Sequence, residues 1–233
     1  MKEEKIEFFS KNKKVFGILH IPNKKNPNAI IMVHGFGGYA FDKPFKDMAE
    51  KLCENGFIVL RFAFRGYDGN EILKDTTISK EIFDLKAAID FIEKQKINKI
   101  GLITESLGGS IAILLNDSRV NAMFLMAPTI YFKDTFPKSR YEEYAGEKFL
   151  EEIDEIDRIK ESQIKAIKCP VMIVHGSNDK DVNPKQSEEL FKIANKPKDF
   201  VLIENGKHVL TRDLSSRKKI IRLSLEWFNK WLK

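Results

Sequence analysis

Long apolar runs are missing from the sequence. None approaches the roughly 18 residues that a membrane-spanning helix needs. The opening residues, Met1-Lys-Glu-Glu-Lys5, contain no apolar stretch of the kind found in a secretory signal peptide. We therefore expect a cytoplasmic protein with no membrane partner.

Cysteine is also scarce. The two cysteines, Cys53 and Cys169, lie far apart and have no metal-ligand spacing. They are typical of small apolar residues in a reducing compartment. The sequence predicts no metal site and gives no sign of a cofactor.

Charge of one sign is not concentrated in any segment. The sequence contains 40 Lys and Arg residues and 34 Asp and Glu residues, which gives a net charge of +6. The lysines are scattered, and no basic block is interleaved with aromatic residues. We expect no nucleic-acid partner, and the oligomeric state stays open, with a homodimer among the alternatives.

What is present is a regular alternation of apolar segments. A chain of 233 residues with 42% hydrophobic content can bury one sizeable core, so we expect a single domain over 1–233. The expected strands are 6–9, 15–21, 29–33, 57–62, 100–104, 122–126, 171–174 and 200–203. The expected helices are 45–55, 82–92, 107–115, 187–194 and 221–232. Strands that alternate with helices predict an α/β fold with a mostly parallel central sheet flanked by helices.

One segment, 129–168, interrupts this alternation. It holds no obvious strand and carries several aromatic residues among many charges, including Tyr131, Phe136, Tyr144 and Phe149. A loop of about 40 residues without a function is unusual in a compact domain. We predict a small helical cap insertion over the functional site, with a surface elaboration as the alternative.

The most informative stretch is the strand 100–104 followed directly by the helix 107–115, with Ser106 at the corner. A serine on such a tight bend exposes its hydroxyl near the positive end of a helix. This indicates a nucleophile, although many serines cap helices for structural reasons alone. The usual nucleophile pattern is Gly-x-Ser-x-Gly, and here Thr104 replaces the first glycine.

A serine nucleophile needs a base and a carboxylate that orients the base. Of four histidines, His208 lies in a loop after the last expected strand and is the best candidate for the base. His34 and His175 each end a strand and precede a glycine, which favours structural roles. Asp179 is the preferred carboxylate because it comes first after the strand 171–174, and Asp181 is the alternative.

The order Ser106, Asp179, His208 resembles that of the α/β-hydrolases, from about Val15 to the C-terminus. The segments His34–Gly38, Arg65–Gly69 (with Asp68 inserted), His175–Asp179 and Gly206–His208 are similar to family motifs. The resemblance implies an α/β-hydrolase fold of the serine esterase group and a catalytic Ser106, Asp179 and His208. It also implies an oxyanion hole formed by the N–H groups of Phe36 and Leu107. The short glycine-rich motif and small insertion most resemble feruloyl- and cinnamoyl-esterase-like members.

The resemblance implies a cofactor-free serine hydrolase that cleaves small-molecule carboxylic esters through an acyl-enzyme intermediate. The aromatic residues of the insertion suggest an apolar or aromatic acyl group. A thioesterase, an acyltransferase or a small peptidase would use the same triad. A non-catalytic binding protein on a hydrolase scaffold is the alternative from another class, and the departure at Thr104 is its support.

Overall fold

A computed structural model describes residues 1–23, 28–38, 40–67, 76–137, 141 and 145–233. The strands are β1 (Lys2–Ser10), β2 (Lys13–Ile21), β3 (Asn28–Val33), β4 (Ile58–Phe62), β5 (Lys99–Glu105), β6 (Val120–Met126), β7 (Val171–Gly176) and β8 (Lys198–Ile203). The described residues form one eight-stranded sheet in the order β1-β2-β4-β3-β5-β6-β7-β8. β2 pairs antiparallel with β1 and β4, and all other pairings are parallel. The predicted mostly parallel α/β sheet is confirmed.

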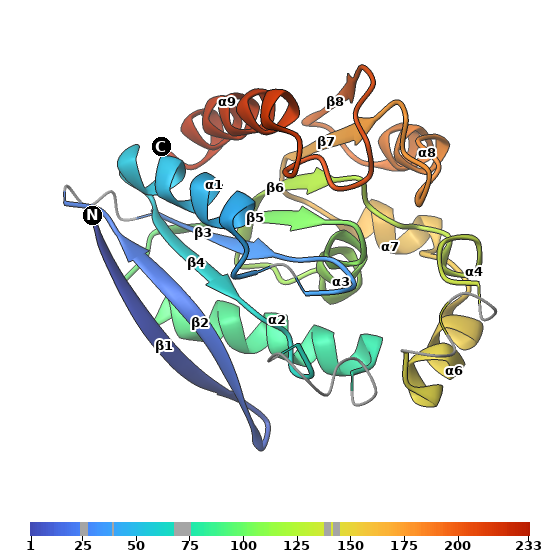
Figure 1. The fold of residues 1–233 in the computed structure, drawn as a ribbon, viewed down its shortest axis with the longest axis horizontal. Coiled ribbons are helices and arrows are strands. Elements are labelled where there is room, and N and C mark those ends of the chain that lie inside the picture. Colours follow the sequence, from blue (N-terminus) through green and yellow to red (C-terminus); the bar gives the residue numbers. More distant parts are fainter. Residues whose placement is uncertain (24–27, 39, 68–75, 138–140, 142–144) are drawn as a thin grey trace.

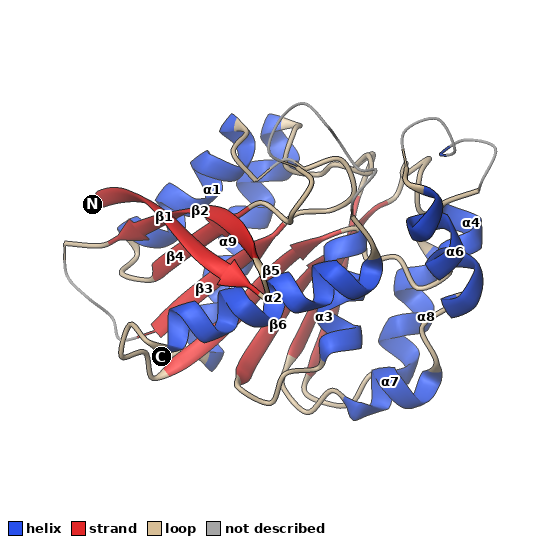
Figure 2. Ribbon diagram, turned by 90° about the horizontal axis from the view of Figure 1, so that it is seen from below, coloured by secondary structure: helices blue, strands red, loops and turns tan. Residues whose placement is uncertain are grey.

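Helices cover both faces of this sheet (Figure 1). They are α1 (Lys43–Glu54), α2 (Ile78–Glu93), α3 (Leu107–Leu115), α4 (Phe132–Thr135), α6 (Glu147–Ile156), α7 (Glu161–Ala166), α8 (Lys185–Ile193) and α9 (Leu214–Trp231). α1 and α9 pack together on one face, and α2 and α3 lie side by side on the other, as Figure 2 shows from below. Each face buries its own apolar cluster, so the central strands are apolar on both sides.

Two helices begin earlier than the apolar pattern predicts, because caps set their first residues. α9 begins at Leu214, where the Asp213 carboxylate accepts a hydrogen bond from the backbone N–H of Ser216 at 2.7 Å. α2 begins at Ile78, where the Thr77 hydroxyl accepts from the N–H of Lys80. Such caps satisfy N–H groups that a helix leaves without partners in its first turn. No described helix combines the length and apolar character needed to cross a bilayer.

The insertion predicted over 129–168 divides into two parts. α4 and α6 contact each other and lie at the end of the molecule away from the β1–β2 hairpin (Figure 1). α7 instead packs against α3 and α8, so it belongs to the helical layer on the sheet. All three helices lie between β6 and β7, within the range over which the insertion is predicted. Tyr144 and Asp68, which the sequence analysis singled out, lie outside the described residues.

Candidate active site

The carboxyl ends of four parallel strands place the candidate residues along one edge of the sheet. Phe36 follows β3, Ser106 follows β5, Asp179 follows β7 and His208 follows β8. Parallel strands end at the same edge, which is where α/β sheets gather their sites. Ser106 and His208, which lie 102 positions apart in the chain, thus become neighbours.

Ser106 occupies a sharp bend between β5 and α3. Its backbone has φ 51° and ψ −121°, a conformation that non-glycine residues rarely adopt. Its backbone N–H donates to the carbonyl of Met126 on the neighbouring strand at 2.8 Å. A strained residue held in this way is typical of a nucleophile elbow. The bend forms even though Thr104 precedes it.

Two glycines allow the loop after β3 to approach this bend. A Cβ atom on Gly35 would lie 2.9 Å from the Cβ atom of Ser106. A Cβ atom on Gly108 would lie only 2.5 Å from the carbonyl oxygen of His34. Any side chain at either position would push the loop away from Ser106. The glycines therefore bring the backbone of the Phe36 segment next to the hydroxyl.

The structure brings Ser106, His208 and Asp179 together. Nε2 of His208 lies 2.9 Å from Oγ of Ser106, so it can accept the hydroxyl proton. Nδ1 of the same ring lies 2.7 Å from Oδ2 of Asp179 and donates to it. This hydrogen-bonded chain has the arrangement of a serine nucleophile, a base and an orienting carboxylate.

The loop after β7 distinguishes Asp179 from Asp181. Oδ1 of Asp179 accepts the backbone N–H of Asp181 at 2.8 Å and that of Val182 at 2.9 Å. Burial acts to raise the pKa of Asp179, but hydrogen bonds from His175 and His208 outweigh it and hold this pKa well below its ordinary value. Asp179 is therefore the carboxylate that faces His208, and Asp181 contributes a backbone donor to it.

The charge state of His208 depends on several carboxylates. Burial acts to lower the pKa of His208, but the hydrogen bond and charge of Asp179 raise it above the ordinary value, with smaller contributions from Glu105 and Asp181. Glu105 precedes Ser106 and is buried, with Thr211 donating to its Oε1 at 3.4 Å. Burial raises the pKa of Glu105 to about 7.

The other histidines make hydrogen bonds inside the protein. Nδ1 of His34 donates to the Gly35 carbonyl at 2.7 Å, and Nε2 accepts the Phe64 N–H at 3.0 Å. Burial lowers the pKa of His34 to about 4, which keeps the ring neutral. His34 thus supports the loop that carries Phe36. His20 lies on β2 and accepts a hydrogen bond from Arg61, away from the site.

The predicted oxyanion residues are Phe36, which follows Gly35 in the loop that approaches Ser106, and Leu107, which follows Ser106 in the chain. Leu107 is the first residue of α3, where a backbone N–H has no acceptor within the helix. The ring of Phe36 packs among three aromatic rings of the insertion. Its centroid lies 5.4 Å from that of Phe136, 5.3 Å from Tyr141 and 5.1 Å from Phe149. The insertion therefore contacts the loop that follows β3.

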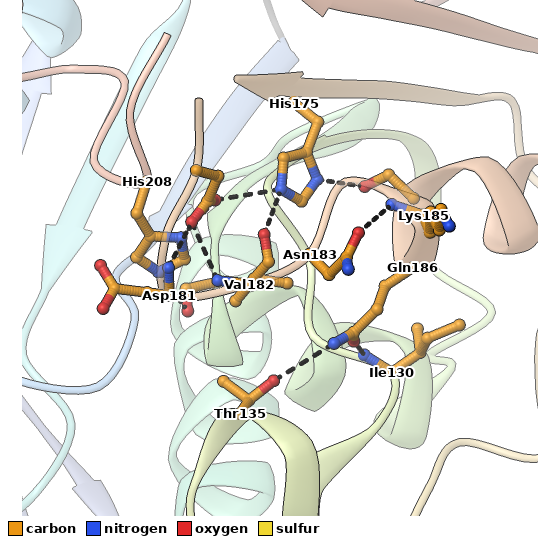
Figure 3. Close-up of polar contacts among 12 residues, drawn as sticks. Ile130, Thr135, His175, Asp181, Val182, Asn183, Lys185, Gln186 and His208 are labelled. Carbon is orange, nitrogen blue, oxygen red and sulfur yellow. Dashed lines mark hydrogen bonds and ion pairs between the residues drawn. The ribbon is translucent and has the colours of Figure 1, made fainter. Parts of the chain in front are cut away.

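A cleft of about 560 Å³ borders Asp179 between α4 and the start of α8. Its lining is polar and mixes both charges, with Asp134 and Glu189 beside Lys180 and Lys185. Gln186 also lines the cleft, and its side-chain oxygen accepts the N–H groups of Ile130 (Figure 3) and Tyr131. Within the described part of the chain, no group of three or more His, Cys, Asp or Glu residues is arranged to hold a metal ion.

A family model described as the prolyl oligopeptidase family matches residues 44–233, which include Ser106, Asp179 and His208. The chain belongs to the prolyl oligopeptidase family. This assignment agrees with the α/β-hydrolase resemblance seen in the sequence.

Several proteins with sequences similar to this chain are named as esterases or acyl transferases. A putative esterase/lipase 2 of Mycoplasma genitalium is 33% identical over 51% of the chain and 44% of that relative. An acyl transferase of Photorhabdus luminescens is 32% identical over 49% of the chain and 38% of its own length. Each of these two matches thus covers about half of the chain and less than half of the relative.

Solved structures share the fold of this family member over nearly its whole length. The esterase domain of a Rhodothermus marinus protein superposes with a TM-score of 0.79, at 20% identity, and both chains are covered completely. The Est1E protein of Butyrivibrio proteoclasticus with ferulic acid bound has a TM-score of 0.77, at 20% identity, and covers 96% of this chain and 99% of its own. These likenesses establish the α/β-hydrolase fold.

Two residues that lie beside Asp179 and His208 were not predicted from the sequence to be part of the candidate site. The sequence favours a structural role for His175, and the structure adds that its Nε2 lies 3.0 Å from Oδ2 of Asp179. The available signal was its position four residues before that aspartate. Glu105 was not singled out, although a carboxylate next to a candidate nucleophile in a buried strand is itself unusual.

Proposed function

We propose that the protein hydrolyses small-molecule carboxylic esters through an acyl-enzyme intermediate on Ser106. The observation that carries this proposal is the hydrogen-bonded chain from Ser106 Oγ through His208 to Asp179. The strained serine bend and the esterase-like relatives support it. The chemistry needs an activated hydroxyl, a base near neutral pH and donors for an oxyanion.

In the first half of the reaction, Oγ of Ser106 attacks the ester carbonyl while Nε2 of His208 takes the hydroxyl proton. Asp179 stabilises the imidazolium through Nδ1. The N–H groups of Phe36 and Leu107 would donate to the oxyanion, and one such donor contributes roughly 3–4 kcal/mol. The C–O bond then breaks, and the alcohol leaves with the proton from His208.

In the second half, water attacks the acyl carbonyl and gives a proton to Nε2 of His208. The bond from the acyl carbon to Oγ breaks, the proton returns to Ser106, and the carboxylic acid is released. We propose an apolar or aromatic acyl group, because aromatic rings of the insertion surround Phe36 at the oxyanion loop. The fold shared with Est1E, which binds ferulic acid, agrees with this proposal.

A fluorophosphonate probe tests the proposal, because it reacts with an activated serine. We expect labelling of the wild-type protein that disappears in Ser106→Ala, together with hydrolysis of p-nitrophenyl esters. Ser110→Ala is the matched control, since Ser110 lies on α3 and its hydroxyl bonds to the Thr129 carbonyl. An unlabelled, folded wild-type protein would instead support a non-catalytic binding protein.

Acyl transfer is the second candidate function, and the acyl transferase relative favours it. In that reaction an acceptor alcohol, rather than water, would attack the acyl group on Ser106. Adding alcohols or amines to an ester assay separates the two, because a transferase forms a new ester or amide in preference to free acid. Acyl-CoA and aminoacyl amide substrates in the same assay test the thioesterase and peptidase alternatives.

A further inference from the structure

His175 makes a second imidazole contact to the carboxylate beside His208. Its ring lies at the end of β7 and is fully buried. Nε2 lies 3.0 Å from Oδ2 of Asp179 and 3.1 Å from the carbonyl oxygen of Val182. Both neighbours are acceptors, so Nε2 carries a proton and donates. In Figure 3 the rings of His175 and His208 lie on either side of a carboxylate, and a dashed line joins each ring to it.

The opposite nitrogen of His175 has a partner that fits this arrangement. Nδ1 lies 2.6 Å from the hydroxyl oxygen of Ser187 on α8. A hydroxyl can donate to an unprotonated ring nitrogen, and this leaves the ring proton on Nε2. Ser187 is fully buried, so the bond is shielded from water. The contact between α8 and β7 thus determines which nitrogen faces Asp179.

The carboxylate of Asp179 therefore accepts four hydrogen bonds. Two backbone N–H groups hold Oδ1, while His175 and His208 share Oδ2. An ionised carboxylate offers about four lone-pair positions, so its capacity is filled. A second donor on Oδ2 draws charge away from the bond to His208 and fixes the rotation of the carboxylate.

We propose that His175 is a positioning residue that shares Oδ2 of Asp179 with His208 and thereby sets the basicity of His208. This inference rests on the proposed function, because it assigns His208 as the base. The other charged groups that face His208 are Glu105 and Asp181, and Arg212 faces Glu105. Among these charged groups, His175 is hydrogen-bonded to Asp179, so it affects the basicity of His208 through that carboxylate.

Replacement of His175 tests the inference through the pH profile. In His175→Phe, Oδ2 serves His208 alone, and the backbone donors still hold Oδ1. The pKa of His208 should rise, so the acid limb of kcat/KM should move upward by about one pH unit. At pH values below both acid limbs, activity should be roughly tenfold lower than in the wild type, and the two profiles should converge at alkaline pH. General structural damage would lower activity at every pH.

His175→Gln is the conservative variant, because its amide N–H can reach the place of Nε2. We expect it to restore most of the wild-type pH profile. Ser187→Ala should move the acid limb of kcat/KM upward, as His175→Phe does, but by a smaller amount. Ser224→Ala is its matched control, since Ser224 is also buried and bonds a carbonyl within α9. An acid limb that stays in place or moves downward in His175→Phe overturns the inference.

Nitrogen-15 NMR on the wild-type protein provides a test that needs neither turnover nor a folded variant. We expect the His175 proton on Nε2, and a proton on Nδ1 alone would overturn the inference. NMR titration of His208 in His175→Gln and Ser187→Ala measures its basicity directly. If fluorophosphonate fails to label Ser106, the proposed function fails, while these NMR results still decide the hydrogen-bond sharing.

Discussion

Gly109 lies directly against Thr104 beneath the bend that carries Ser106. A Cβ atom on Gly109 would come within 3.2 Å of Oγ1 of Thr104 and within 2.9 Å of the Cβ atom of Pro128. The threonine replaces the glycine that usually stands two residues before the nucleophile, and the glycine at 109 leaves room for it. The departure in the motif is thus accommodated locally, and Ser106 keeps its strained conformation.

The space around Thr104 predicts opposite effects for two substitutions. Thr104 is fully buried, and its hydroxyl has no hydrogen-bond partner among the described residues. Thr104→Val keeps the shape and removes this polar group, so we expect a gain of about 1 kcal/mol in unfolding free energy. In Gly109→Ala, overpacking costs about 1–3 kcal/mol and outweighs the roughly 1 kcal/mol gain in helix propensity. Urea unfolding measures both, and a stable Gly109→Ala protein would contradict this account of the motif.

The two aspartates of the loop after β7 should behave differently. Asp179→Asn should fold normally but lose about 10⁴-fold in kcat, because an amide cannot stabilise the imidazolium of His208 as a carboxylate does. Asp181→Asn is the control, because it keeps the backbone N–H that binds Oδ1 of Asp179. Steady-state kinetics on an ester substrate measures both. Similar losses in the two variants would show that the loop geometry, and not the Asp179 charge, is limiting.

The acid limb of activity should lie above pH 6.5 and respond to Glu105. Protonation of His208 removes its ability to accept the Ser106 proton, so activity is lost as pH falls through the raised pKa of His208. Glu105→Gln removes a negative charge that raises this pKa, so its acid limb should move to lower pH. Glu204→Gln, at an exposed carboxylate before His208, should leave the limb in place. Profiles of kcat/KM between pH 5 and 9 measure the position of the acid limb in each variant. If wild type and Glu105→Gln have the same acid limb, the charge of Glu105 does not raise the pKa of His208.

The aromatic contacts of Phe36 predict that the insertion affects turnover. Phe149 is fully buried, and its ring centroid lies 5.1 Å from that of Phe36. Phe149→Leu should loosen the loop that presents the Phe36 N–H and lower kcat on the order of tenfold, since a whole oxyanion donor contributes about 10²–10³. Phe57→Leu is matched in burial but lies in the cluster under α1 and α9. Equal kcat values for the two variants, measured below their unfolding temperatures, would argue against this role.

Local patterns predicted the architecture well because each element carries its own signal. The apolar strand 100–104 and the small-residue helix 107–115 agree with β5 and α3, since burial on both faces requires continuous apolar residues. The starts of α2 and α9 were missed because Thr77 and Asp213 determine them through hydrogen bonds. The packing of α7 on α3 and α8 is a tertiary contact, which the local pattern of the insertion does not predict.

The sequence by itself determined the α/β alternation and the chain order of Ser106, Asp179 and His208, since apolar periodicity and motif order are properties of neighbouring residues. Only the tertiary structure decided that Asp179 rather than Asp181 faces His208, because that choice depends on how the loop after β7 turns its backbone N–H groups toward Oδ1. It also revealed the second imidazole of His175 on the same carboxylate. Hydrogen bonds between separate strand ends depend on distances that no local pattern encodes.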